Sequence, residues 1–156
     1  MKEVLERKSN FDPERLQFAK KLKADNNFTP CPINDGDELY PNGIFVFNIT
    51  KMHDFLITNP NEIDCVEVEV YDFPRSFSYI DESHVDSVDI SLPVILAEIS
   101  PGNYNLIDGN HRMEKARRMG IERISAYKFY VNQHLNFLTD DKAYRSYIDY
   151  WNGKCI

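Results

Sequence analysis

Residues 93–130 read PVILAEISPGNYNLIDGNHRMEKARRMGIERISAYKFY and carry the clearest structural pattern in the chain. Pro93–Ile99 is short and apolar, which predicts a strand, and Tyr104–Ile107 predicts its partner across a turn centred on Pro and Gly. A helix is expected from about Asn110 to Met119, with a glycine as its stop, and Arg123–Tyr130 predicts another strand. This order of elements predicts an α+β fold, in which helices pack on a mixed β-sheet.

The residues before this segment predict further elements. A helix is expected to begin with Asp12 as N-cap and Pro13 as its first residue, and an apolar stripe extends it to Leu22. Residues 26–43 contain many Asn, Asp, Gly and Pro, which predicts a long loop or arm. Gly43–Ile49 is rich in β-branched and aromatic residues, which favours a strand.

Three more elements complete the predicted fold. Thr50 is the expected N-cap of a short helix, and the alternating valines of Cys65–Tyr71 predict a half-buried strand. Thr139 is the expected N-cap of a last helix, with Gly153 beyond its end. That helix has an apolar stripe, which predicts a face that docks on the core or on a second copy in a homodimer: Tyr144, Tyr147, Ile148 and Trp151.

Length and charge limit the classes of protein to consider. The 156 residues suit one compact domain, made of an N-terminal helix and arm (1–43), a core (44–130) and a C-terminal helix (131–156). The net charge of −7 disfavours a broad surface for duplex DNA or an anionic membrane. No segment reaches the ~20 apolar residues that a bilayer span needs, so no membrane partner is expected and the cytoplasm is the favoured location.

The cysteines give no sign of a metal or disulfide framework. Cys31, Cys65 and Cys155 are odd in number, widely spaced and without a CxxC pair. They are expected to be reduced thiols.

The segment Asp108-Gly-Asn-His-Arg112 lies where a predicted strand meets a predicted helix, and it predicts an anion site. The first N–H groups of a helix lack partners within the helix, and Gly109 lets the backbone approach a ligand closely. Arg112 adds a planar guanidinium suited to phosphate oxygens, and His111 adds a hydrogen bond. The same residues also suit a purely structural turn and cap, so both interpretations remain open.

The distribution of charge favours the anion site. Residues 108–118 have a net charge of +2, and the rest of the chain therefore has −9. Basic residues on a helix are also often no more than a solvated face, so charge alone does not choose between the two interpretations.

The stretch Tyr104–Gly120, followed by Ile124–Tyr127, resembles the core of the ParB/sulfiredoxin superfamily. The resemblance covers about a quarter of the chain and implies that Gly109, Asn110, His111 and Arg112 contact a phosphate of a nucleotide or a nucleic acid. Asn110 occupies the place of the reactive cysteine of sulfiredoxins, which excludes sulfiredoxin activity. It also departs from the Glu of ParB-type members, which weakens the case for metal-assisted nucleotide hydrolysis.

Hydrolysis or phosphoryl transfer would also need a base. Asp86 and Asp89 are the candidates for this role, with His84 nearby, and the same groups could instead ligate a cation or cap local turns. Asp108 would orient His111 or Arg112, or hold a metal. His111 could itself act as acid or base, and Mg²⁺ carried with a nucleotide is the cofactor that such chemistry implies.

Other residues give weaker indications. His53 and His134 have no partner readable from the sequence and are assigned to the surface or the core. A group of aromatic residues is typical of a core more than of a base-stacking platform: Phe45, Phe47, Phe73, Phe77 and Tyr79.

The leading hypothesis is therefore a domain that binds a phosphate-bearing ligand at residues 108–112, with a nucleotide as the first candidate. One alternative is a ParB-like nuclease or DNA-associated protein. Another is a non-catalytic protein-interaction module that retains the fold, with a protein partner.

Overall fold

Strand β4 (Val94–Ser100) runs through the middle of the molecule, and all seven of its residues are buried. It pairs antiparallel with β5 (Asn103–Asp108) and parallel with β6 (Arg123–Phe129). Strand β3 (Asp64–Glu69) pairs antiparallel with β6, so the sheet has the order β3-β6-β4-β5. The computed structural model describes residues 8–74 and 80–156.

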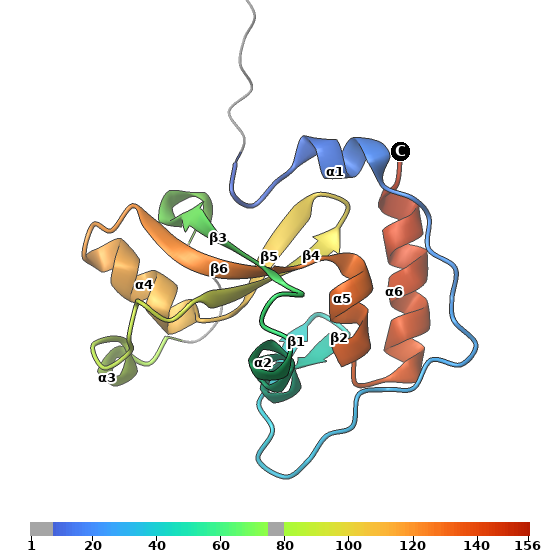
Figure 1. Ribbon diagram of the computed structural model, residues 1–156, viewed down its shortest axis with the longest axis horizontal. Helices are drawn as coiled ribbons and strands as arrows, with labels where there is room; N and C mark the ends of the chain where they lie inside the picture. The colour runs from blue at the N-terminus through green and yellow to red at the C-terminus, as the bar shows by residue number, and fades with distance from the viewer. Residues whose placement is uncertain (1–7, 75–79) are drawn as a thin grey trace, which may run out of the picture.

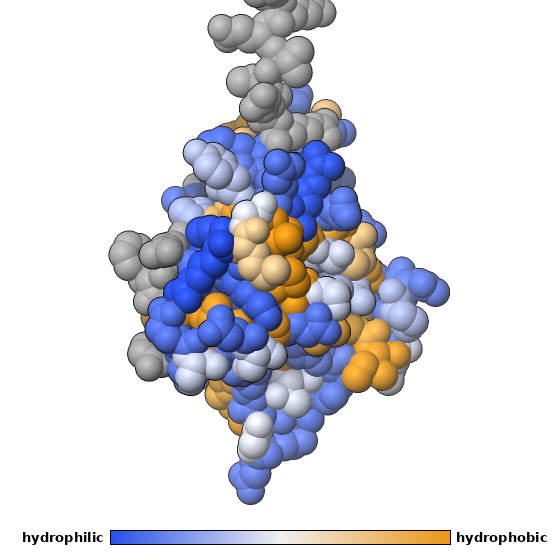
Figure 2. Space-filling view, turned by 90° about the vertical axis from the view of Figure 1, so that its left-hand side faces the viewer, coloured by the Kyte–Doolittle hydropathy of each residue, from blue (hydrophilic) through white to orange (hydrophobic). Residues whose placement is uncertain are grey.

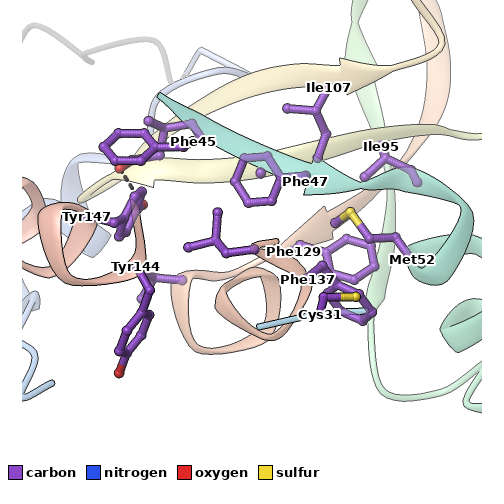
Figure 3. Close-up of a cluster of buried hydrophobic side chains, with 14 of the residues drawn as sticks. Cys31, Phe45, Phe47, Met52, Ile95, Ile107, Phe129, Phe137, Tyr144 and Tyr147 are labelled. Carbon is purple, nitrogen blue, oxygen red and sulfur yellow. Dashed lines mark hydrogen bonds between the residues drawn. The ribbon is translucent and has the colours of Figure 1, made fainter. Parts of the chain in front are cut away.

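The two faces of this sheet are covered by different elements (Figure 1). Helix α4 (Asn110–Arg118) packs on the face to which Val94 and Leu96 point. The opposite face carries a larger apolar cluster, part of which Figure 3 shows. Its other walls are the hairpin β1 (Leu39–Asn42) and β2 (Phe45–Asn48), α2 (Ile49–Thr58), α5 (Val131–His134) and α6 (Asp141–Lys154).

The α+β class and the mixed sheet that the sequence predicts are confirmed. The predicted order of strand, turn, strand, helix and strand over residues 93–130 is observed as β4, β5, α4 and β6. Phe45, Phe47 and Phe73 are core residues, as predicted, whereas Phe77 and Tyr79 lie outside the described residues. The apolar stripe of α6 is buried within the domain, which confirms that it docks on the core.

The first helix is shorter than its apolar pattern predicts. Helix α1 (Pro13–Phe18) is capped by the Asp12 side chain as expected, but it ends at Phe18. Beyond it, the backbone of Leu22 exchanges two hydrogen bonds with the side chain of Asn152 on α6. These tertiary contacts hold the arm against the domain in an irregular conformation.

Two of the predicted helix caps are wrong. The cap of α2 is Asn48, which accepts a hydrogen bond from the N–H of Lys51, whereas the predicted Thr50 lies inside the helix. The cap of α6 is Asp140 and not Thr139, whose hydroxyl donates to a carbonyl of β2. Gly153, predicted to lie past the end of α6, is within it.

Short elements connect the larger ones. Strand β3 ends at Glu69 and continues as the 3₁₀ helix η1 (Val70–Asp72), so the predicted strand to Tyr71 is two residues too long. Helix α3 (Glu82–Val85) interrupts the long connection before β4, and η2 (Leu135–Phe137) follows α5. All three cysteines are free thiols. In the described part of the chain, no helix has the length and apolar character needed to cross a membrane.

Candidate functional site

The junction between β5 and α4 is a single residue, Gly109. Its φ of +98° lies in the left-handed region, and a Cβ there would lie 2.5 Å from Cγ1 of Val94. The sequence predicts that the backbone at Gly109 lies close to a ligand. In the structure, this backbone lies close to Val94 in the core. Gly109 is the N-cap of α4, and no side chain caps the helix. Within the described residues, the first N–H groups of α4 therefore have no side-chain partner.

Asp108, the last residue of β5, accepts two hydrogen bonds on one oxygen. His53 Nε2 lies 2.8 Å from its Oδ2, and Arg112 Nη2 lies 3.0 Å from the same atom. Burial by itself would raise the pKa of Asp108, but the two cationic partners outweigh burial and lower it. The hydrogen bond to Asp108 in turn raises the pKa of His53. Asp108 thus orients Arg112, which is one of the roles predicted for it. It also contacts His53, and the sequence did not predict this contact.

Arg112 is directed into the protein. Its Nη1 donates to the carbonyl oxygens of Pro93 and Leu92 at 2.7 and 3.3 Å, and its side chain is only 14% exposed. With the bond to Asp108, the guanidinium ties the start of β4 to the end of β5 and the start of α4. These contacts give Arg112 a positioning role.

His111 and His84 face each other across the space between α4 and α3. Their rings form an edge-on pair with centroids 4.7 Å apart. His111 Nε2 accepts a hydrogen bond from the backbone N–H of Asp81 at 3.1 Å, so the proton of the neutral ring sits on Nδ1. The side chain of Asp81 accepts a hydrogen bond from the N–H of Ser83 and so caps α3, the helix that carries His84.

These groups line an open cleft of about 400 Å³ at the end of β5. Three imidazoles contribute to its wall: His53 from α2, His84 from α3 and His111 from α4. Asp108 and the start of α4 also line it. Glu38 and Tyr40 form the remaining polar wall on the side of the hairpin. In the parts of the chain that the structure covers, no group of three or more His, Cys, Asp or Glu is arranged to hold a metal ion.

The basic residues of α4 are all engaged in contacts within the protein. Lys115 donates to the carbonyl oxygens of Asp86 and Val88, each at 2.9 Å. Arg117 pairs with Glu114, and Arg118 pairs with Glu82 at 2.7 Å. The positive charge that the sequence concentrates on this helix is therefore largely compensated by neighbouring groups.

The two predicted bases lie apart from the cleft. The side chain of Asp89 accepts hydrogen bonds from the hydroxyl and the N–H of Ser91, and these bonds lower its pKa. This is the turn-capping role that the sequence offered as the alternative. Asp86 contributes its backbone carbonyl to Lys115, and neither aspartate is part of the cleft wall.

His53 is the site residue that the sequence did not indicate. It lies 55 positions before Asp108, and no local motif surrounds it. Its place in the cleft results from the packing of α2 beside β5. A short predicted helix that bears one His is too weak a signal to have assigned it a role.

A second hollow, of about 1070 Å³, lies elsewhere on the molecule, between η1 and the end of α4. Its wall includes Val70, Phe73 and Ile121, and it contains none of the predicted site residues. Figure 2 views the side on which α3 and α4 lie and shows apolar surface bordered by hydrophilic residues. Its wall also carries charged side chains, among them Lys8, Asp72 and Glu122, whereas the three imidazoles line the smaller cleft.

Comparisons with protein-family models, with curated proteins and with solved structures found no match to this chain.

Proposed function

We propose that the cleft at the end of β5 binds a small phosphate-bearing ligand, with a nucleotide as the leading candidate. The observation that carries this proposal is the start of α4, which has no side-chain cap and opens into a cleft lined by three imidazoles. Free N–H groups and the partial positive charge of a helix start favour an anion. Imidazole N–H groups are donors of the same kind.

The contacts assigned to the ligand differ from those in the first hypothesis. In this proposal the N–H groups of Asn110 and His111 donate to phosphate oxygens, and Nδ1 of His111 is a further donor. Gly109 keeps the helix start open because it brings no side chain that could cap it. Arg112 supports the site indirectly, since its side chain is 14% exposed and its Nη atoms donate to Asp108 and to backbone carbonyls.

An NMR titration tests this proposal. Inorganic phosphate and a nucleoside triphosphate are added separately to ¹⁵N-labelled protein, and the amide signals of residues 110–112 are expected to shift in a saturable way. His111→Gln is expected to weaken binding about tenfold, as for one hydrogen bond to a charged group. Arg145→Gln, in an exposed ion pair on α6, is the control and should bind as the unmodified protein does.

Two results of that titration would contradict the proposal. One is the absence of any saturable shift near α4 with either ligand, and the other is equal affinity of the His111→Gln variant. A shift with phosphate but a weaker response to the triphosphate would keep the anion site and reject the nucleotide.

The resemblance to the ParB/sulfiredoxin superfamily supports the same ligand class, because the phosphate loop of that superfamily corresponds to residues 108–112. Mg²⁺ would then arrive with the nucleotide, since the described residues offer no metal cluster of their own. The nuclease or DNA-associated alternative rests on the same resemblance, and the internal pairing of Arg117 and Arg118 on α4 weighs against it. The interaction module rests on Asn110 alone.

A further inference from the structure

Asp108, His53 and Arg112 form a charge cluster with one exposed member. The side chains of Asp108 and Arg112 are 11% and 14% exposed, whereas that of His53 is 43% exposed. We propose that His53, and not Arg112, supplies the positive charge that binds the phosphate-bearing ligand in the cleft. This inference rests on the function proposed above and names the side chain that controls binding.

Three of the five N–H groups of Arg112 donate within the protein and its side chain is less exposed than that of His53, so His53 is the more accessible donor. Arg112 directs Nη2 to Asp108 and Nη1 to the carbonyl oxygens of Pro93 and Leu92. His53 uses only Nε2 for Asp108, and its Nδ1 has no hydrogen-bond partner among residues 8–74 and 80–156. When the ring is protonated, Nδ1 carries an N–H that can donate a hydrogen bond to a ligand.

The net charge of the cluster depends on one proton. The carboxylate of Asp108 and the guanidinium of Arg112 cancel, so the cluster has a charge of +1 with a protonated His53 and no charge with a neutral one. The cluster itself attracts an anion only when His53 is protonated, whereas the N–H groups at the start of α4 act at every pH. Since the cleft is partly shielded from water, that difference is larger than it would be on an open surface.

The surroundings of His53 set the pH at which the proton is lost. Asp108 raises the pKa of His53 through its hydrogen bond and its charge, while burial and Arg112 oppose this. Glu38, before β1, also raises it. The other titratable groups on the cleft wall are Tyr40 on β1, His84 on α3 and His111 on α4. The net pKa is raised, so anion binding should persist toward neutral pH and fall as the pH rises through that value.

The test uses sulfate, which keeps a constant double charge, and inorganic phosphate in parallel. Affinity is measured from the amide shifts of residues 110–112 at several values between about pH 5.5 and 8.5, around the ordinary pKa of His. For sulfate, we expect at least a tenfold loss of affinity across this range. His53→Gln should bind weakly at every pH, and Arg145→Gln should behave as the unmodified protein does.

A second variant separates a binding role from a structural one. Asp108→Asn removes the group that raises the pKa of His53 and leaves the charge of Arg112 uncompensated, so sulfate affinity should rise overall while its pH-dependent part moves to lower pH, in step with the ring signals of His53. Flat pH profiles, or equal affinity of the His53→Gln variant, would overturn this inference and leave the proposed function standing. No saturable shift at residues 110–112 at any pH would overturn both.

Discussion

His134 shows most clearly how burial changes a single residue. Its ring is fully buried between Phe47 and Tyr147, and Nε2 donates to the backbone carbonyl of Glu98 at 2.6 Å. Its Nδ1 has no hydrogen-bond partner within the described residues. Burial lowers the pKa of His134 to about 4. The neutral ring therefore fits the core, and a proton added to Nδ1 would have no acceptor.

This environment predicts acid sensitivity. In the unfolded chain His134 takes up a proton below about pH 6.5, but in the folded protein it does so only near pH 4. Its contribution to stability is therefore complete above about pH 6.5 and is lost as the pH falls toward 4, by at most about 3 kcal/mol. Urea unfolding at several pH values measures this loss. His134→Gln should show a smaller loss of stability over the same interval, and an identical loss would contradict the prediction.

The functional side chains show a similar dependence on context. Arg112 has the chemistry to bind a phosphate, yet its side chain is 14% exposed and both Nη atoms donate to Asp108 and to carbonyls just before β4. His53 has no sequence context, yet it reaches the cleft with one nitrogen available. The residue types thus define what each group can do, and the contacts define which group does it.

Among the elements, the β5–α4 junction is where local pattern and packing agree best. Asp108 ends the strand, Gly109 takes a left-handed conformation, and α4 begins at Asn110. The fold requires a glycine here, because the position beside Val94 has no space for a Cβ.

Two glycine substitutions test this requirement. Gly109→Ala combines an unfavourable φ with a clash against the buried and stiff Val94, so we expect a loss of about 2–4 kcal/mol in the free energy of unfolding. Gly120→Ala is the matched control, since its φ is +70° and no atom lies within 4 Å of the added Cβ. It should lose only about 1 kcal/mol. Equal losses in urea unfolding would show that packing against Val94 is unimportant.

For the molecule as a whole, Glu98 connects distant parts of the chain. This fully buried carboxylate on β4 accepts hydrogen bonds from Arg15 on α1, from the N–H of Gly102 and from the N–H of Val131. It thereby fixes the N-terminal helix and the start of α5 to the central strand.

Removal of the Arg15 guanidinium should lower the free energy of unfolding, because the carboxylate of Glu98 is buried. Arg15→Ala leaves the buried charge of Glu98 without its ionic partner, and we expect about 3 kcal/mol of destabilisation in urea unfolding. Arg145→Ala removes an exposed pair with Asp141 and should change stability by less than about 0.5 kcal/mol. Similar small effects of both variants would mean that water replaces the guanidinium beside Glu98.

Local sequence was sufficient for the elements between Pro93 and Tyr130, because a short apolar run, turn residues and a glycine stop each constrain neighbouring residues. It was not sufficient for helix limits that depend on distant partners. The first helix ends at Phe18, before an arm that hydrogen-bonds to α6. The cap of α2 is Asn48, whose side-chain amide also donates to Asp37 and to the carbonyl of Pro32.

The α+β class, the sheet core and the glycine turn at residue 109 follow from patterns within short segments, where chemistry acts between neighbours in the chain. The composition of the cleft does not. The pairing of His53 with Asp108 and the inward direction of Arg112 exist only because α2, β4, β5 and α4 pack together, and hydrogen bonds across such distances leave no periodic trace in the order of residues.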